Sequence, residues 1–193
     1  MTKIGIIRHG TTEWNKLGRA QGNSNIPLDQ DGRVQAMRLG ARIKDENWDV
    51  IYTSPLARAL ETAQIIQDSA ALPELHMDNR LKEIGGGKIE GTTHTERIEA
   101  WGENWASLDL GMEPTAAVIE RGVAFFEDIA VKHPRESVLV VSHGSFIRHL
   151  LIELLPEFDG QIQLLNTSLS IFTIDPVWKA EFINCVLHLE EKN

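Results

Sequence analysis

Short apolar runs alternate with longer amphipathic stretches along this chain, and the alternation predicts strands separated by helices. The apolar runs are rich in β-branched residues, as the buried strands of a parallel sheet are. They cover residues 4–7, 49–53 and 138–141. Apolar residues at helical spacing predict helices. These cover about 29–48, 54–69, 115–132 and 145–155. Two further predicted strands, 168–174 and 180–188, suit an antiparallel pair at one edge of the sheet.

The residues at two helix starts are typical capping residues. Asp29 or Asp31 is expected to cap the first helix, and Ser54 is expected to cap the second, with Pro55 in its first turn. Residues 11–28 are rich in Thr, Asn, Gly and Gln and are predicted to form a loop.

The pattern predicts one α/β domain spanning residues 1–193, a three-layer α/β/α sandwich with a mostly parallel central sheet. Residues 92–112 are less regular, and we expect a small helical or irregular insertion there, over one edge of the sheet. Trp101 and Trp105 lie one helical turn apart within it. We expect them to pack the insertion onto the sheet; the alternative is that they line an apolar substrate mouth.

Composition narrows the class of partner. The formal net charge of -9 argues against nucleic acid or an anionic membrane as the main ligand, but not against a small phosphorylated metabolite. A single cysteine, Cys185, cannot form a disulfide framework, and the chain start lacks the features of a secretory signal. A cytoplasmic location is therefore expected. The sequence gives no prediction of oligomeric state.

Three of the predicted strands end in loops that carry cations and histidines. Arg8 and His9 follow the first strand, Arg58 follows the second, and His143 follows the third. The carboxyl ends of parallel strands share one edge of a sheet, so these side chains are expected to converge there. Gly144 lies at a predicted helix start, where free N–H groups favour an anion.

A carboxylate stands just before a run of three glycines, at Glu83. Such a run is a poor helix or strand, and it predicts a loop that approaches another group closely. Glu90 lies nearby and is a rival for the same chemistry. The glycine run with Lys88 is not a nucleotide-binding P-loop, because Ile89 stands where Ser or Thr is required.

Four segments in order resemble the histidine phosphatase superfamily, in its phosphoglycerate mutase-like branch. They are Arg8-His9-Gly10-Thr-Thr-Glu-Trp-Asn15, Ser54-Pro-Leu-Ala-Arg-Ala59, Leu81-x-Glu83 with Gly87 and Glu90-Gly91, and Val141-Ser-His-Gly144. The resemblance runs from residue 3 to about residue 150.

The resemblance implies a phosphohistidine mechanism. His9 would attack phosphorus with one ring nitrogen while a backbone carbonyl holds the other, and Glu83 would protonate the leaving oxygen. The phosphoryl oxygens would be held by Arg8, Arg58 and His143. Secondary donors would be Asn15, Gln21, Gly22 and Gly144. No metal or cofactor is expected, because the arginines neutralise the charge.

The sequence leaves three functions open. We expect hydrolysis of a small phosphomonoester, because residues 92–112 hold Arg97 and several acidic residues, which suits a mutase intermediate poorly. Cofactor-dependent mutase-type phosphoryl transfer is the alternative. A non-catalytic phosphoryl-binding protein is less favoured, since a pure binder needs neither a nucleophile nor an acid. The sequence does not name the substrate.

Overall fold

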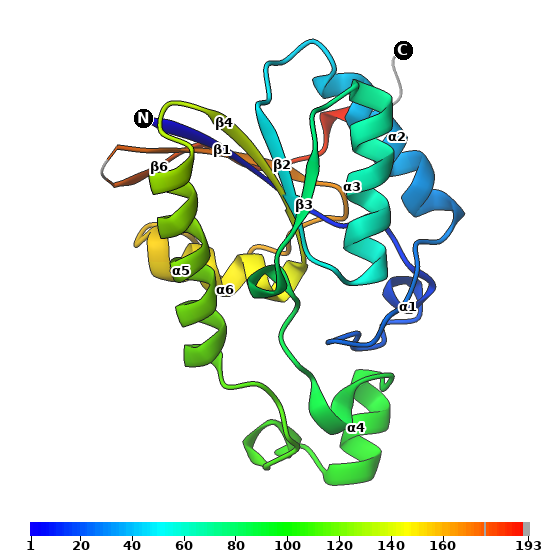
Figure 1. The fold of residues 1–193 in the computed structure, drawn as a ribbon. Helices are drawn as coiled ribbons and strands as arrows, with labels where there is room; N and C mark the ends of the chain where they lie inside the picture. Colours follow the sequence, from blue (N-terminus) through cyan, green and yellow to red (C-terminus); the bar gives the residue numbers. More distant parts are fainter. Residues whose placement is uncertain (176, 191–193) are drawn as a thin grey trace.

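The computed structural model describes residues 1–175 and 177–190. It contains a six-stranded sheet with the strand order β3-β2-β4-β1-β5-β6 (Figure 1). The strands are β1 Thr2–Arg8, β2 Val50–Thr53, β3 Leu75–Met77, β4 Ser137–Ser142, β5 Leu169–Ile174 and β6 Trp178–Cys185. The sequence predicted all of these except β3, which has only three residues, none of them buried.

Four neighbouring strands run parallel, and the last two are antiparallel. β1 pairs in parallel with β4, β4 with β2, and β2 with β3. β5 runs antiparallel to β1, and β6 runs antiparallel to β5, which confirms the predicted edge pair. Arg8 lies opposite Ser142 and Thr53 lies opposite Val141, so β1, β2 and β4 end at the same edge.

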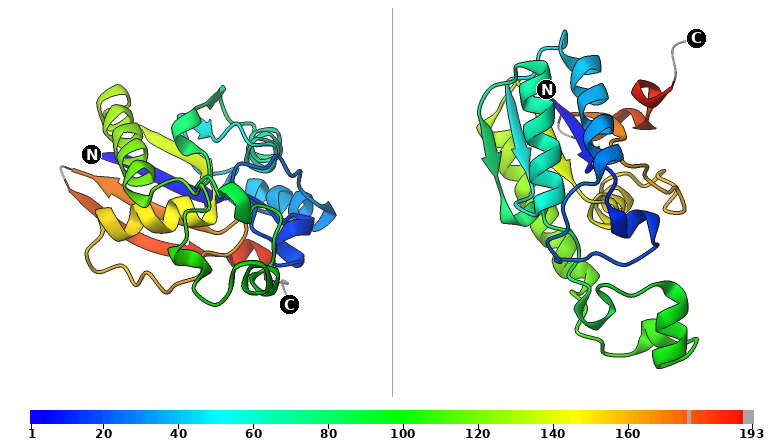
Figure 2. Two further views of the ribbon diagram at one scale, coloured as in Figure 1. Left: turned by 90° about the horizontal axis from the view of Figure 1, so that it is seen from below. Right: turned by 90° about the vertical axis from the view of Figure 1, so that its right-hand side faces the viewer.

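Successive side chains along a strand point to opposite faces of the sheet, and here they enter two separate hydrophobic cores. On β1, Ile4 and Ile6 belong to one core and Ile7 to the other. The first core includes residues of α5 Thr115–Lys132 and α6 Gly144–Leu154. The second includes residues of α2 Gln30–Ile43 and α3 Ala57–Ala70. The three-layer α/β/α sandwich is therefore confirmed, with two helices on each face of the sheet (Figure 2).

The ends of two helices differ from the prediction. Asp29 caps α2, accepting a hydrogen bond from the Gly32 N–H at 2.7 Å, but α2 ends at Ile43, earlier than expected. α3 begins at Ala57 after the N-cap Leu56, which makes no side-chain capping bond, so the predicted Ser54 cap is wrong. A short helix, α1 Glu13–Lys16, interrupts the predicted loop, because Thr12 and Asn15 form a capping box.

Residues 92–112 form α4 His94–Trp101 and a 3₁₀ turn at Trp105–Ser107. They project away from the three layers, on the side where β1, β2 and β4 end (Figures 1 and 2). None of the helices in the described residues combines the length and the hydrophobicity needed to cross a bilayer.

Candidate active site

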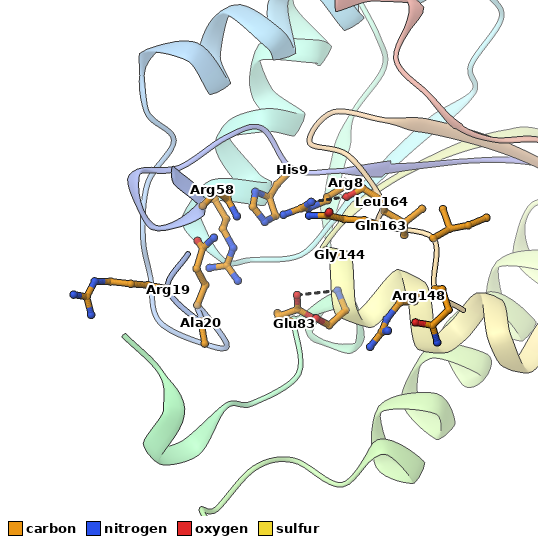
Figure 3. Close-up of a pocket in the computed structure, with 15 residues that line it drawn as sticks. Arg8, His9, Arg19, Ala20, Arg58, Glu83, Gly144, Arg148, Gln163 and Leu164 are labelled. Atoms are coloured by element: carbon orange, nitrogen blue, oxygen red, sulfur yellow. Dashed lines mark hydrogen bonds between the residues drawn. The ribbon is translucent and has the colours of Figure 1, made fainter. Parts of the chain in front are cut away.

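A cleft of about 350 Å³ opens where β1, β2 and β4 end (Figure 3). Its lining combines residues from both ends of the chain. They are Arg8, His9, Asn15, Arg19, Ala20, Gln21, Arg58, Glu83, Gly144, Ser145, Arg148, Gln161, Ile162, Gln163 and Leu164. We call Arg8, His9, Arg58 and the adjacent His143 the inner end of the cleft. We call Arg19, Arg148 and residues 161–164 its mouth.

His9 is held in one tautomer by the main chain. Its side chain is 98% buried at the end of β1, and its Nδ1 lies 2.7 Å from the Gly10 carbonyl oxygen. A carbonyl can only accept, so Nδ1 donates and the neutral ring keeps its lone pair on Nε2. Burial, with the charges of Arg58 and then Arg8, holds the pKa of His9 well below the usual value for histidine. His9 is thus a neutral imidazole at physiological pH, with the tautomer that a nucleophile needs.

The close turn after His9 explains why Gly10 follows it. A β-carbon on Gly10 would lie 2.6 Å from the carbonyl oxygen of Gly32, in α2. Any larger residue would therefore push this turn away from α2.

Two guanidinium groups flank His9, that of the buried Arg58 and that of the partly buried Arg8 (Figure 3). Arg8 donates from one terminal nitrogen to the Leu164 carbonyl, and Arg58 donates to the carbonyls of Ser24 and Gly22, at 2.8 and 2.7 Å. Burial lowers the pKa of Arg58 to about 10, so it stays charged at neutral pH. The Nε atoms of both arginines are buried and have no partner in the described residues. The inner end therefore holds two fixed cations with hydrogen-bonding capacity left over, as an anion site requires.

His143 lies behind this pair and is completely buried. The centroid of its ring is 5.2 Å from that of His9, and its Nε2 is 2.8 Å from the Ser54 hydroxyl oxygen. Ser54 thus contacts a histidine at the inner end rather than capping α3. Within the described chain the other nitrogen, Nδ1, has no partner. Burial, followed by the charge of Arg58, lowers the pKa of His143 well below the usual value.

Glu83 reaches the cleft as the cap of α6. Its carboxylate accepts hydrogen bonds from the N–H groups of Ser145 and Phe146, at 3.1 and 2.8 Å, and from that of Ile84, at 2.9 Å. The helix N-terminus predicted as an anion site is thus occupied, at these two amides, by a carboxylate of the protein itself. The positive ends of these amides fix the carboxylate at one wall of the cleft (Figure 3).

The rival carboxylate, Glu90, does not line the cleft. It accepts hydrogen bonds from the Ser24 hydroxyl, at 2.5 Å, and from the N–H groups of Asn23 and Gly86, both at 2.9 Å. Burial raises the pKa of Glu90, but these bonds outweigh it, and the net shift is downward. Glu90 therefore organises the loop whose carbonyls hold Arg58.

The four predicted secondary donors separate into two groups. Asn15, Gln21 and Gly144 line the cleft, whereas Gly22 does not. Gly22 has a positive φ of 49°, and a β-carbon there would lie 2.1 Å from a Glu90 carboxylate oxygen. The role of Gly22 as a donor to the ligand stays a prediction. In the structure its carbonyl accepts from Arg58, and glycine is needed for close packing against Glu90.

The residues at the mouth of the cleft were not predicted from the sequence. Arg148 lies on α6 one turn after Gly144, and among the described residues its one hydrogen bond goes to the Gly160 carbonyl, at 3.3 Å. Arg19 pairs with both carboxylate oxygens of Glu96, at 2.8 and 2.9 Å. The spacing of Arg148 from Gly144 was the available signal, because residues four apart share a helix face. Nothing in the sequence placed residues 161–164 here.

The insertion lies outside the cleft lining. None of residues 92–112 is among the described residues that line the cleft. Trp105 packs inside the insertion instead, with its ring 4.7 Å from the Arg97 guanidinium and 6.3 Å from the His94 ring. Both expectations for Trp105, packing on the sheet and lining the mouth, are therefore wrong. Trp101 is half-buried and also lies outside the lining.

Comparison with known proteins decides the family. The sequence model described as Histidine phosphatase superfamily (branch 1) matches residues 4–184. The chain belongs to this superfamily. It is 35% identical to "Uncharacterized phosphatase PhoE" of Bacillus subtilis, across 98% of this chain and 97% of that protein. It is 31% identical to a 2,3-bisphosphoglycerate-dependent phosphoglycerate mutase of Parvibaculum lavamentivorans, across 83% of each chain.

A solved structure of the same superfamily shows the same fold. It is a mutant phosphoserine phosphatase from Entamoeba histolytica in complex with phosphoserine. The TM-score is 0.81 at 32% identity, and the match covers 98% of this chain and all of that one. These relatives support an enzyme of a class that contains both phosphatases and mutases.

Proposed function

We propose that this protein is a metal-independent phosphatase that hydrolyses a small phosphomonoester through a phosphohistidine on His9. The observation that carries the proposal is the hydrogen bond from His9 Nδ1 to the Gly10 carbonyl. It leaves the Nε2 lone pair between the guanidinium groups of Arg8 and Arg58, where a phosphoryl group would be held for attack.

In the first step His9 Nε2 forms a bond to phosphorus, and the bond from phosphorus to the leaving oxygen breaks. Arg8 and Arg58 stabilise the charge on the phosphoryl oxygens as it redistributes, so the arginines supply the neutralisation that a metal supplies elsewhere. Glu83 donates its proton to the leaving oxygen.

In the second step a water oxygen attacks phosphorus, and the bond between phosphorus and Nε2 breaks. Glu83, now a carboxylate, accepts a proton from that water. Inorganic phosphate leaves, and His9 and Glu83 return to their starting states. Glu83 lines the same cleft as Arg8 and Arg58, which supports both roles for its carboxyl group.

Two observations favour hydrolysis over a mutase reaction. The single arginine of residues 92–112, Arg97, lies over the Trp105 ring and not in the cleft. The other arginine near the insertion, Arg19, is paired with Glu96. A mutase must retain a bisphosphate between its two half-reactions, and in the described residues the insertion adds no free cation to Arg148 at the mouth for holding its second anionic group.

The substrate is best sought among small phosphorylated acids and alcohols. The solved relative that binds phosphoserine makes phosphoserine the first compound to test, with 3-phosphoglycerate and 4-nitrophenyl phosphate beside it. Phosphate release should proceed in excess chelator, and His9→Asn should abolish it. His94→Asn, at an exposed histidine outside the cleft, is the matched control and should leave it unchanged.

Mutase activity should be measured in parallel, with and without a bisphosphate primer. Release of phosphate without isomerisation supports the phosphatase. Primer-dependent isomerisation with little phosphate release would overturn it in favour of the mutase. Binding of phosphate without turnover of any compound would indicate a phosphoryl-binding protein.

A further inference from the structure

Arg121, on α5, makes an unusual number of contacts with the segment that carries Glu83. Its guanidinium donates to three main-chain carbonyls, those of Arg80, Lys82 and Glu83, at 2.6, 2.7 and 3.2 Å. It also donates to both carboxylate oxygens of Glu113, at 2.8 and 3.0 Å. All five N–H groups of the arginine therefore have a partner.

Glu113 also forms hydrogen bonds with Gly85, two positions beyond Glu83. Its Oε2 accepts from the Gly85 N–H at 3.0 Å, and its own N–H donates to the Gly85 carbonyl at 2.8 Å. Residues 83–85 are thus tied by their main-chain groups to the Arg121–Glu113 pair. Neither partner of this pair lines the cleft.

The same arginine also contacts the helix start that holds the carboxylate. The Arg121 guanidinium lies over the Phe146 ring, 5.0 Å from its centroid. The N–H of Phe146 is the one that donates to Glu83 at 2.8 Å. One guanidinium therefore contacts both sides of the Glu83 hydrogen bond: the main chain that carries the carboxylate and the residue that orients it.

We propose that Arg121, together with Glu113, is a positioning residue that sets where the Glu83 carboxyl lies relative to the leaving oxygen. The inference rests on the proposed function, in which Glu83 is the proton donor. A misplaced acid loses its effect on the reaction even when it is present, since displacements of about 1 Å cost up to about 100-fold in rate.

Arg80 offers a matched control. It also links this segment to α5, through Asp128 and the Ala124 carbonyl, and its guanidinium lies over the Phe125 ring. Within its own segment it pairs with Asp78. Its side chain makes no bond to residues 83–85 among the hydrogen bonds of the described residues. Loss of Arg80 therefore removes a comparable anchor without releasing Glu83.

The test compares two leaving groups. An alkoxide needs a proton as it departs, whereas 4-nitrophenolate departs without one. The ratio of kcat/KM for an alkyl phosphate to that for 4-nitrophenyl phosphate therefore measures the contribution of the proton donor. Arg121→Met should lower kcat/KM for an alkyl phosphate by about 10- to 100-fold and for 4-nitrophenyl phosphate by less than about threefold. Arg80→Met should change both substrates by the same small factor.

A double-mutant cycle shows whether Arg121 acts through Glu83. Glu83→Gln should sharply lower the ratio of kcat/KM for the alkyl phosphate to kcat/KM for 4-nitrophenyl phosphate. Adding Arg121→Met should not change that ratio further. Equal losses on both substrates in Arg121→Met, or a further fall of the ratio in the double variant, would overturn the inference. If Arg121→Met does not fold, Glu113→Gln carries the test, with a smaller shift of the ratio in the same direction.

The outcomes separate the two proposals. If wild type releases phosphate from neither substrate, or if His9→Asn retains activity, the proposed function fails. If wild type and His9→Asn behave as expected but Arg121→Met leaves the ratio unchanged, only the positioning role fails.

Discussion

At the inner end of the cleft, main-chain carbonyls hold His9 and Arg58, whereas at the mouth Arg148 and residues 161–164 come from one helix face and a loop. His9, Arg58 and His143 are at most 2% exposed, and the orientation of His9 and of Arg58 is fixed by backbone carbonyls. At the mouth, Arg148 is half-buried and has one long hydrogen bond. Rigid, buried groups suit the chemical step, while loosely held groups at an opening suit selection among substrates.

The difference predicts that substitutions at the two ends change different kinetic constants. Arg58→Met removes a buried cation and should lower kcat/KM by about two to three orders of magnitude. The fall should appear for every phosphomonoester, because the phosphoryl group is common to all of them. Steady-state kinetics on two unlike substrates measures it.

Arg33→Met is the control for this experiment. Arg33 pairs with Glu61 on α3 and lies outside the cleft lining, so its loss should leave kcat/KM within about twofold of wild type, as expected for a surface ion pair. A comparable loss in both variants would mean that Arg58 acts only through stability.

At the mouth, Arg148→Ala should raise KM by about tenfold or less and leave kcat nearly unchanged, because it removes binding made equally in ground and transition states. The effect should be confined to substrates with a second anionic group beside the phosphate. Arg38→Ala, at an exposed position on α2, is the matched control and should have no effect. A fall in kcat on every substrate would place Arg148 with the inner end.

The smallest expected change concerns pH. Since the pKa of His9 lies well below its usual value of 6.5, the free enzyme should keep a neutral His9 when the pH falls from 7.5 to 6.5. Imidazole nitrogen shifts in NMR spectra should report the Nδ1–H tautomer throughout this range. Half-protonation of His9 at pH 6.5 would show that burial and the arginines do not act on it as the structure indicates.

The same comparison explains what could be predicted from the sequence. Arg8, His9, Arg58 and His143 each follow a short, buried, apolar run, so their convergence followed from the parallel sheet alone. The strand β3 was missed because three partly exposed residues carry no periodic signal. The tie between Glu83 and the start of α6 joins residues about sixty positions apart, and local patterns do not encode such a contact.

The role of the insertion was the least accurate expectation. Its two tryptophans were expected to pack on the sheet or to line the mouth, but the described lining places Arg148 and residues 161–164 at the mouth instead. Arg148 lies on α6, and residues 161–164 lie between α6 and β5, all outside the four segments that carry the family resemblance. Loop placement depends on tertiary packing, which periodicity does not reveal.

The central claim is that His9 carries the phosphoryl group during turnover. Rapid quenching with a phosphorus-labelled substrate tests it most directly, in wild type, Glu83→Gln and His9→Asn. The account predicts an acid-labile label on wild type and on Glu83→Gln, mapped to His9, and no label on His9→Asn. Label that persists on His9→Asn, or turnover by wild type without any phosphoenzyme, would contradict it.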